Sequence, residues 1–165
     1  MKAVVQRVLS SSVTIRGAVT AEIGPGLTIL LAVTHGDNED DARKLAEKIA
    51  GLRIFNDEAG KMNRSVRETD GEALVVSQFT LFGDCRKGNR PSFSQAAEPE
   101  TANRLYELFV RQLAAAGVKT VRKGVFAADM KVQILNDGPV TLIIDTDDLK
   151  KSRRNPSSGE RLEDA

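Results

Sequence analysis

The segment LTILLAVT, residues 27–34, is a nearly continuous apolar run in the first quarter of the chain. Runs of this length between turn formers are typical of a strand that is buried on both faces of a sheet. The turn formers GPG precede it at residues 24–26 and lack the Lys-Ser/Thr of a phosphate-binding loop. We therefore expect residues 27–34 to form the central strand of the fold.

Strand patterns recur on both sides of this segment. The opening stretch KAVVQRVLSSSVTIRG, residues 2–17, mixes β-branched and polar residues at roughly alternate positions, which predicts two short strands before a turn at Gly17. Gly138 and Pro139 separate the last two of the remaining expected strands. These strands are EALVVSQFTLF (72–82), VKTVRK (118–123), DMKVQILN (129–136) and VTLIIDT (140–146).

Two segments have the periodicity of amphipathic helices. The first follows Asp37, which can cap it, and ends at Gly51, whereas the second runs from Pro99 to Gly117. A β-rich chain with only two main helices predicts an α+β fold. We expect a single domain with a mostly antiparallel or mixed sheet rather than a doubly wound α/β fold.

The composition narrows the classes of function. Of the 165 residues, 41% are hydrophobic and 28% are charged, as in an ordinary globular domain. The net charge of +1 gives no direct pointer to nucleic acid. One histidine and one cysteine cannot supply a zinc site or an intrachain disulfide. We expect no metal, no cofactor, no membrane span and a cytoplasmic location.

The C-terminal segment differs from the rest of the chain. Residues 150–165, KKSRRNPSSGERLEDA, lack apolar periodicity and hold five basic residues against three acidic ones. This composition predicts a basic, disordered tail after a domain that spans residues 1–149. Residues 1–149 then carry 19 basic and 20 acidic side chains, so a polyanion site on the folded part has to be a local patch.

The reactive side chains allow more than one interpretation. His35 is the only histidine available as the base of a serine-type triad, and we favour an ordinary exposed loop histidine. Cys85 is likewise expected to be a plain loop thiol. The loop cations Arg86, Lys87 and Arg90 either bind phosphate or are simply solvated, and the residues alone leave both open.

Two motifs contain polar groups in unusual places. In SQFTLF, residues 77–82, hydroxyl and amide groups lie within an apolar strand, where they need hydrogen-bond partners if they are buried and otherwise face water. In NDGPVT, residues 136–141, the local chemistry favours a plain hairpin turn, because only a minority of X–Pro bonds are cis.

Taken together and in this order, SQFTLF and NDGPVT closely resemble the two signature motifs of the D-aminoacyl-tRNA deacylases, also called D-Tyr-tRNA deacylases. The resemblance covers nearly all of residues 1–145, whereas the tail is longer than the family pattern and no function is carried onto it. Further matching motifs are QRV (6–8), RIF (53–55), GKMN (60–63), RPSF (90–93) and FAADM (126–130).

The resemblance implies an enzyme that hydrolyses the ester of D-aminoacyl-tRNA, with aminoacyl-tRNA bound through its acceptor end. The terminal adenosine would contact Phe126 and Met130, for which plain core packing is the alternative. The catalytic pocket would be formed by Ser77, Gln78, Phe79 and Thr80.

The family is homodimeric, and the resemblance implies that one subunit inserts a cis Gly138–Pro139 peptide into the pocket of its partner. Arg7 would brace this segment from below. Rigid main-chain atoms would then exclude an L side chain, so selectivity comes from rejection. Glycine has no side chain to exclude, which predicts glycyl-tRNA, including glycine mischarged on tRNA-Ala, as a secondary substrate.

The shortage of bases predicts a mechanism that relies on placement. Backbone N–H groups near Phe79 and Thr80 are candidates for an oxyanion site, and the 2′-hydroxyl of the substrate would help to activate water. Thr80 as a covalent nucleophile is the rival view. Two other classes remain open, a non-catalytic RNA-binding protein that uses the basic loop and tail, and a small-molecule esterase on the same scaffold.

Overall fold

The chain opens with one long strand, β1 (Lys2–Ile15), in the computed structural model, which describes residues 1–151. Two short strands were expected here. β1 remains continuous because β3 pairs with its first half, β2 with its second half and β8 with both. The other elements are β2 (Ala18–Ile23), β3 (Gly26–Ala32), α1 (Glu39–Ala50), β4 (Phe55–Asn56), β5 (Met62–Arg64), β6 (Glu72–Ser77), the 3-10 helix η1 (Phe79–Phe82), α2 (Pro99–Ala115), β7 (Val121–Lys123), β8 (Lys131–Asp145) and α3 (Thr146–Lys150).

The main sheet is mixed, as the sequence predicts. Its strands follow the order β2-β1-β3-β6-β7, with β8 beside β1. β1 is antiparallel to β2, β3 and β8. β6 lies between β3 and β7 and is parallel to both. The expected central strand is confirmed, because β3 lies between β1 and β6. The carboxyl ends of the parallel strands therefore meet at one edge of the sheet.

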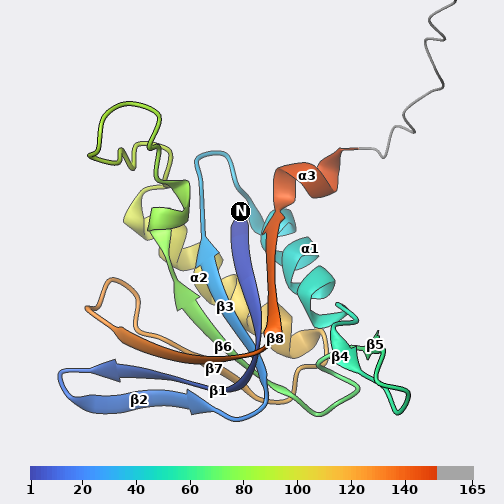
Figure 1. Ribbon diagram of the computed structural model, residues 1–165. Coiled ribbons are helices and arrows are strands. Elements are labelled where there is room, and N and C mark those ends of the chain that lie inside the picture. The colour runs from blue at the N-terminus through green and yellow to red at the C-terminus, as the bar shows by residue number, and fades with distance from the viewer. Residues whose placement is uncertain (152–165) are drawn as a thin grey trace, which may run out of the picture.

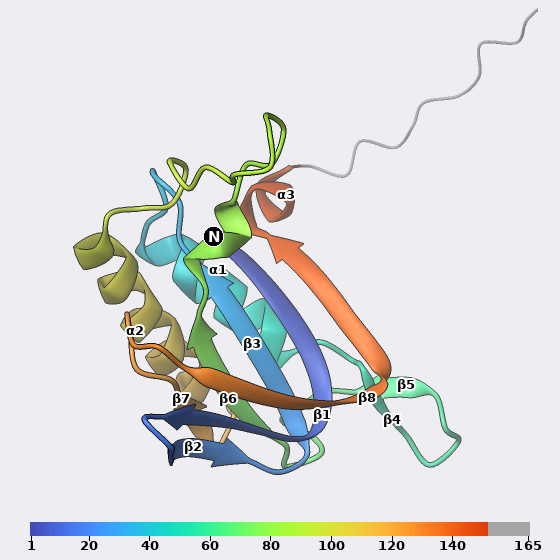
Figure 2. The same cartoon turned by 60° about the vertical axis from the view of Figure 1, so that its left-hand side comes forward.

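Helices α1 and α2 cover the same face of the sheet (Figures 1 and 2). Leu45 of α1 and Phe109 of α2 pack in one buried cluster with Val5, Ile29 and Val75 from the three middle strands. Both predicted helices are confirmed, since their buried residues recur at the spacing that the sequence shows. None of the helices in the described part of the chain is long and apolar enough to cross a membrane.

The start of α1 corrects one prediction. Asn38, not Asp37, is the N-cap: its side chain accepts hydrogen bonds from the amides of Asp40 and Asp41. The Asp41 carboxylate accepts the Asn38 amide in return, which completes a capping box. Asp37 instead accepts the amide of Thr34 at 2.7 Å, so it closes the preceding turn.

The opposite face of the sheet is covered only in part. The second half of β1, β2 and the first half of β8 curl across its lower portion in Figure 1. Val8 and Val13 of β1, Ile23 of β2, and Leu74 and Val76 of β6 form a second buried cluster beneath them. The remainder of this face, near the carboxyl ends of β3 and β6, is left free of strands.

The SQFTLF motif also differs from its predicted conformation. The expected strand of residues 72–82 ends at Ser77, which makes the last parallel pair with Leu31 of β3. Beyond that pair the chain turns into η1, and the amide of Leu81 donates to the Gln78 carbonyl at 3.2 Å. Most of the motif therefore lies beyond the carboxyl end of β6 rather than inside the sheet.

The NDGPVT motif forms a projection from β8 rather than a turn between two paired strands. Thr141 pairs with Gln6 and Asn136 with Val8, so four residues of β8 stand opposite the single residue Arg7 of β1. We call these four residues the 137–140 bulge. The two expected strands are thus one strand, because both of its halves pair with β1. The Gly138–Pro139 peptide is cis, as the resemblance implied.

The end of the described chain is a short helix, α3, that was not predicted. Its Lys150 ammonium lies 2.8 Å from the buried Asp41 carboxylate of α1. Lys150 is the first residue of the segment expected to be a tail, and residues 152–165 of that segment lie outside the described residues.

The pairing of β3 with β6 generates a stability prediction at Gly26. A Cβ atom there would lie 1.9 Å from the Glu72 carbonyl oxygen. Gly26→Ala should therefore lower the free energy of unfolding by about 3 kcal/mol, at the upper end of overpacking effects. Gly24→Ala is the matched control, because its Cβ would meet only the Glu72 side chain at 3.7 Å. Urea unfolding that gives equal stabilities for the two variants would contradict this account of the pairing.

Candidate functional site

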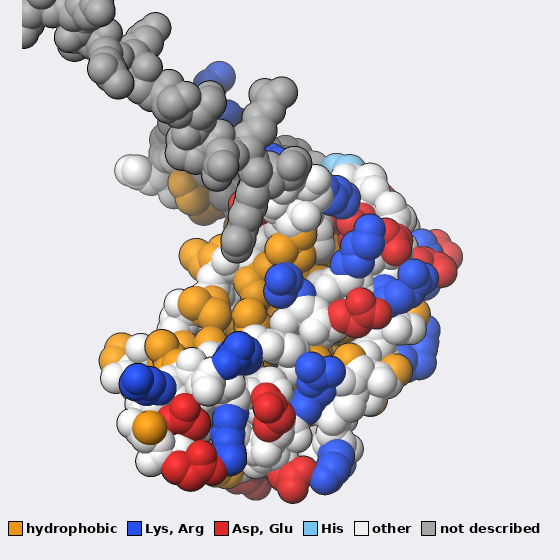
Figure 3. Space-filling model, turned by 90° about the vertical axis from the view of Figure 1, so that its right-hand side faces the viewer, with side chains coloured by type: hydrophobic (Ala, Val, Ile, Leu, Met, Phe, Trp, Pro, Cys, Tyr) orange, Lys and Arg blue, Asp and Glu red, His pale blue; other side chains and the backbone are white. Residues whose placement is uncertain are grey.

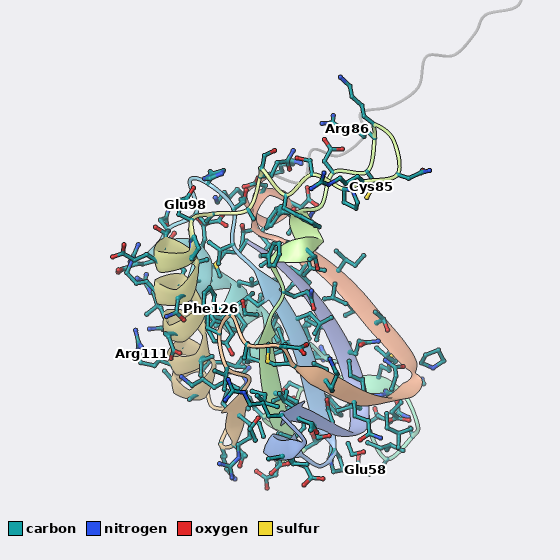
Figure 4. The ribbon with its side chains drawn as sticks, turned by 90° about the vertical axis from the view of Figure 1, so that its left-hand side faces the viewer. Glu58, Cys85, Arg86, Glu98, Arg111 and Phe126 are labelled. Carbon is teal, nitrogen blue, oxygen red and sulfur yellow. The ribbon has the colours of Figure 1, made fainter. Side chains whose placement is uncertain are left out.

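A cavity of about 560 Å³ lies at the carboxyl ends of β3 and β6. Its size is in the range of small-molecule sites. One wall is the start of α2, and another is the segment between β7 and β8, on which Figure 4 shows Phe126 beside α2. The residues lining it are Leu31, Ala32, Val33, Val76, Ser77, Gln78, Phe79, Ala96, Ala97, Pro99, Ala102, Tyr106, Phe126, Ala127, Ala128, Asp129, Met130 and Val132.

The end of β6 supplies the polar part of the cavity. Ser77, Gln78 and Phe79 line it, and the amide of Gln78 donates to the Leu31 carbonyl at 2.8 Å, which fixes the turn into η1. The Gln78 side-chain amide donates to the hydroxyl of Thr80. Thr80 itself is exposed and is not among the lining residues. The structure thus brings three of the four expected catalytic residues to the cavity and leaves Thr80 at its rim.

The segment between β7 and β8 packs closely against the end of β6. Gly124 donates its amide to the Val75 carbonyl at 2.9 Å. A Cβ at Gly124 would lie 2.7 Å from the Met130 sulfur, so the glycine makes room for that side chain. Phe126 and Met130 both line the cavity and are partly buried. They are therefore open to a ligand on one side and packed against the protein on the other.

Tyr106 of α2 supports this wall from below and was not singled out from the sequence. Its hydroxyl donates to the Val75 carbonyl at 2.9 Å, and its ring lies 6.1 Å from that of Phe126. Burial raises the pKa of the Tyr106 phenol, with a further contribution from Glu107, so the hydroxyl remains a neutral donor. A signal was present in the sequence, since this is the only tyrosine and it follows Leu105 on the apolar side of the helix.

No free base faces the cavity from the described residues that line it. Besides Tyr106, the titratable lining residue is Asp129, whose carboxylate lies 3.0 Å from the Lys131 ammonium. His35 is exposed in another loop, where its Nε2 lies 3.0 Å from the Ser94 carbonyl. The interpretation of His35 as a loop histidine agrees with this placement. The site can position a substrate and donate hydrogen bonds, and among the described residues that line it Asp129, paired with Lys131 at the surface, is the one carboxylate.

The basic loop after η1 lies away from the cavity. Figure 4 shows Cys85 and Arg86 on this loop, well separated from Phe126. The Arg86 guanidinium forms two hydrogen bonds with the Asp84 carboxylate, at 2.9 and 2.6 Å. These bonds and the Arg86 amide lower the pKa of Asp84 to about 2. Much of the positive charge of Arg86 is therefore balanced within the loop.

The 137–140 bulge lies at the other end of the sheet. Arg7, which is almost fully buried, donates to the carbonyls of Asp137 at 3.3 Å and Ile54 at 2.7 Å. The Asn136 side chain spans the bulge: its Oδ1 accepts the Val140 amide at 3.1 Å, and its Nδ2 donates to the Val140 carbonyl at 3.2 Å. Arg7 thus contacts the segment it was expected to brace, and Asn136 is a second support that the sequence did not reveal.

The cavity and the bulge of one chain do not meet. Ser77 pairs with Leu31, whereas Arg7 pairs with Leu27, so the two sites are separated by four residues along β3, about 13 Å. They are also separated by three strand spacings across the sheet, about 14 Å. Of the predicted site residues, Ser77, Gln78, Phe79, Phe126 and Met130 come together, and the bulge residues form a separate group with Arg7.

Solved structures with this architecture define the class of protein. One, described as a probable eukaryotic D-amino acid tRNA deacylase, matches with a TM-score of 0.75 at 16% identity, covering 87% of this chain and 97% of that one. At that identity the match shows the fold alone. Another, described as c-Myc DNA Unwinding Element Binding Protein, matches with a TM-score of 0.83 at 41% identity, covering 88% of this chain and 98% of that one. The chain thus has the fold of a deacylase-like α+β protein.

Sequence comparisons identify the family. The family model for D-Tyr-tRNA(Tyr) deacylase matches residues 4–145. The D-aminoacyl-tRNA deacylase of Heliobacterium modesticaldum is 59% identical over 145 residues, covering 88% of this chain and 96% of that protein. That of Ruegeria sp. is 55% identical over 159 residues, covering 96% and 99%. This chain belongs to the D-Tyr-tRNA(Tyr) deacylase family, so the predicted family and the predicted assignment to an enzyme are confirmed. The Ruegeria alignment also extends beyond residue 150, so a tail of this length is found in a relative.

The hydrogen bonds of Tyr106 generate a prediction about the cavity wall. Tyr106→Phe removes the buried hydroxyl, while the Val75 carbonyl keeps its bond from Gly124. The free energy of unfolding should therefore fall by about 1 kcal/mol, the usual net value of one hydrogen bond. Thr20→Val is the control, since it removes an exposed hydroxyl that donates to Val13. Urea unfolding in which Tyr106→Phe is as stable as the unaltered chain would show that the hydroxyl does not support the wall.

Proposed function

We propose that this chain hydrolyses the ester of D-aminoacyl-tRNA and releases the free D-amino acid and the tRNA. The observation that carries the proposal is the family match over residues 4–145. The matched residues include those that line the cavity at the carboxyl ends of β3 and β6, where the one carboxylate, Asp129, is paired with Lys131. Such a cavity suits an ester that is activated by placement. It suits poorly a reaction that needs a strong protein base.

The cavity is lined by groups of two kinds, which suit the two parts of the substrate. Phe126 and Met130 offer apolar contacts to the adenine of the terminal adenosine, while Ser77 and Gln78 offer polar contacts. The ester then lies near the turn from β6 into η1. Phe79 is half exposed and packs edge-to-face on Phe93 with ring centroids 5.2 Å apart, so it forms part of the rim beside the aminoacyl group.

Catalysis proceeds by orientation and oxyanion stabilisation. The amides of Phe79 and Thr80 precede the first helical hydrogen bond of η1, which Leu81 donates. The first N–H groups of a helix have no partner within it, so these two are available to a developing oxyanion. The 2′-hydroxyl of the terminal ribose orients or activates the attacking water. Thr80 is the weaker candidate for a nucleophile, because its hydroxyl is bonded to the Gln78 amide and no base adjoins it.

A second copy of the chain completes the site. The 137–140 bulge is too far from the cavity of its own chain to enter it, and a homodimer brings the two together. Support comes from exposed apolar side chains on β1 and β8: Leu9 is 51%, Leu135 55% and Ile143 73% exposed. Figure 3 shows hydrophobic side chains gathered on the side of the molecule where β8 lies. An uncovered apolar surface of this kind is typical of an interaction site.

Chiral selection follows from the stiffness of the inserted segment. Arg7 and Asn136 hold the bulge from two directions, so its main-chain atoms form a wedge that an L side chain cannot displace. A D residue presents only its hydrogen to the wedge. Glycine presents hydrogen as well, so glycyl-tRNA, including glycine mischarged on tRNA-Ala, is a second substrate. The enzyme acts where aminoacyl-tRNA is used in translation, which in a bacterial cell is the cytoplasm.

A nucleic-acid-binding role without catalysis is the second candidate. It is favoured by the 41%-identical protein of known structure, whose description names it as binding a DNA element. This role predicts salt-sensitive binding without turnover. The pairing of Asp84 with Arg86 argues against it, because this ion pair neutralises one of the three cations of the basic loop.

A series of four substrates tests the activity, the chiral rejection and the role of the ribose. D-tyrosyl-tRNA and glycyl-tRNA should be hydrolysed, and L-tyrosyl-tRNA should be slower than the D form by about a hundredfold, because the wedge leaves no room for its side chain. D-tyrosyl-tRNA with a terminal 2′-deoxyribose should lose most of its hydrolysis. The release of labelled amino acid is measured. Binding of D-tyrosyl-tRNA without release would overturn the proposed activity, and rapid L cleavage would overturn the exclusion model.

Mixed dimers test whether the wedge acts across subunits. Gly138→Ala should distort the bulge, because its Cβ would lie 2.9 Å from both Arg7 Nη2 and Val140 Cγ2. Phe126→Arg should block the cavity. Each variant alone should be inactive. Random mixing after denaturation and refolding should restore about a quarter of full activity, since half of the dimers regain one intact site.

The control for this experiment is a mixture of each variant with itself after the same refolding. Native mass spectrometry establishes that mixed dimers have formed. If mixed dimers form and activity stays at the level of the single variants, the wedge does not act in the partner's cavity.

A further inference from the structure

A second cavity, of about 740 Å³, adjoins the candidate active site. It lies between the tip of the β1–β2 hairpin and the segment that joins β7 to β8, which are neighbours in Figure 2. The two cavities share residues Ala127, Ala128 and Asp129. The second cavity is lined by Thr14, Ile15, Arg16, Gly17, Thr20, Val125, Ala127, Ala128, Asp129 and Lys131.

Residues 127–129 separate the two cavities, and we call this segment the 127–129 partition. On one side of it, Phe126 and Met130 line the active-site cavity; on the other, Val125 and Lys131 line the second cavity. Between these flanks the partition consists largely of alanines, whose side chains are single methyl groups. A flexible chain can therefore pass over residues 127–129 from one cavity to the other.

The second cavity is more cationic than the first. It contains Arg16 and Lys131 against the single carboxylate of Asp129, together with the hydroxyls of Thr14 and Thr20. The Lys131 ammonium lies 3.0 Å from that carboxylate. Arg16 is exposed at the hairpin tip and makes no ion pair or side-chain hydrogen bond to the residues that the structure describes. An arginine left free in this way suits a phosphate, which its guanidinium can bind through two parallel hydrogen bonds.

We propose that the second cavity binds the nucleotide that precedes the terminal adenosine of the tRNA, with its phosphodiester held by Arg16. This inference rests on the proposed function, because the adenosine has to occupy the cavity beside Phe126. The 5′ side of the adenosine then faces the 127–129 partition, and the chain continues over it. Lys131, which is paired with Asp129, lies in the same cavity, and the threonine hydroxyls face the ribose and base.

Two substrates of different length test the inference. D-tyrosyl-tRNA carries the preceding nucleotides, whereas 3′-O-D-tyrosyl-adenosine ends at the adenosine and cannot reach Arg16. Arg16→Asn removes the cation and suits the left-handed backbone of this position, where φ is 50°. We expect kcat/KM for D-tyrosyl-tRNA to fall about tenfold, as for the loss of one charge-assisted hydrogen-bonded contact. The value for D-tyrosyl-adenosine should not change.

The salt dependence gives a second readout that a change in folding would not mimic. The slope of log kcat/KM for D-tyrosyl-tRNA against log salt should become shallower by about 1, the contribution of one phosphate contact. Arg111→Asn is the matched control, because Figure 4 shows Arg111 on the outer side of α2 and it lines neither cavity. Its kcat/KM values should equal those of the unaltered chain.

The outcomes separate this inference from the proposed function. If the unaltered chain releases no amino acid from D-tyrosyl-tRNA, the proposed function fails. If it does release the amino acid, and Arg16→Asn lowers kcat/KM equally for both substrates or for neither, the second cavity does not bind the preceding nucleotide. A loss confined to D-tyrosyl-tRNA that is smaller in Arg16→Lys, which keeps the charge but not the two parallel hydrogen bonds, supports it together with the shallower salt slope.

Discussion

The pairing of β1 with β8 is the constraint on which the rest of the structure depends. Both halves of β8 are held by one partner strand, yet four residues of β8 stand opposite Arg7. The surplus cannot be absorbed in the sheet, so it projects as the 137–140 bulge. The same strand begins at Lys131, directly after Met130 of the cavity wall. The strand that carries the proposed wedge therefore continues directly from the wall proposed to face the adenosine, and its pairing with β1 helps to position both.

The cavity shows how an ester hydrolase can work with few reactive groups. Tyr106 remains neutral because burial raises its pKa, and the Asp129 carboxylate is paired with Lys131. In the proposed mechanism, catalysis relies on shape, on backbone donors and on the substrate 2′-hydroxyl, and the first two depend on rigid surroundings. This explains why so much hydrogen bonding converges on the turn after β6 and on the segment from Gly124 to Met130. The proposed rejection of an L side chain also requires rigidity, so in this proposal catalysis and selectivity depend on one property.

The sequence predicted the parts of the fold that are set by local pattern. The apolar run of β3 and the periodic faces of α1 and α2 were predicted correctly, because a buried strand or helix face imposes its own spacing of apolar residues on the local sequence. The conformation around Gly138 and Pro139 was harder to predict, since the same residues are compatible with a hairpin turn and with a bulge. Only the distant residues Gln6 and Val8, through their pairing with β8, decide between the two. The resemblance to a family supplied what local chemistry could not, whereas the roles of Tyr106 and Asn136 depend on contacts with residues far along the chain.

The near-neutral charge of the chain bears on how it recognises a polyanion. Several surface cations are paired with carboxylates, among them Lys119 with Asp70, Lys123 with Glu107 and Arg104 with Glu39. Paired cations attract phosphate weakly, so these three pairs add little to the attraction of a tRNA body. Arg16 is better placed for recognition, because it is unpaired among the described residues and lines a cavity. An enzyme that reads only the acceptor end can act on many tRNAs, because that end is what differently charged tRNAs have in common.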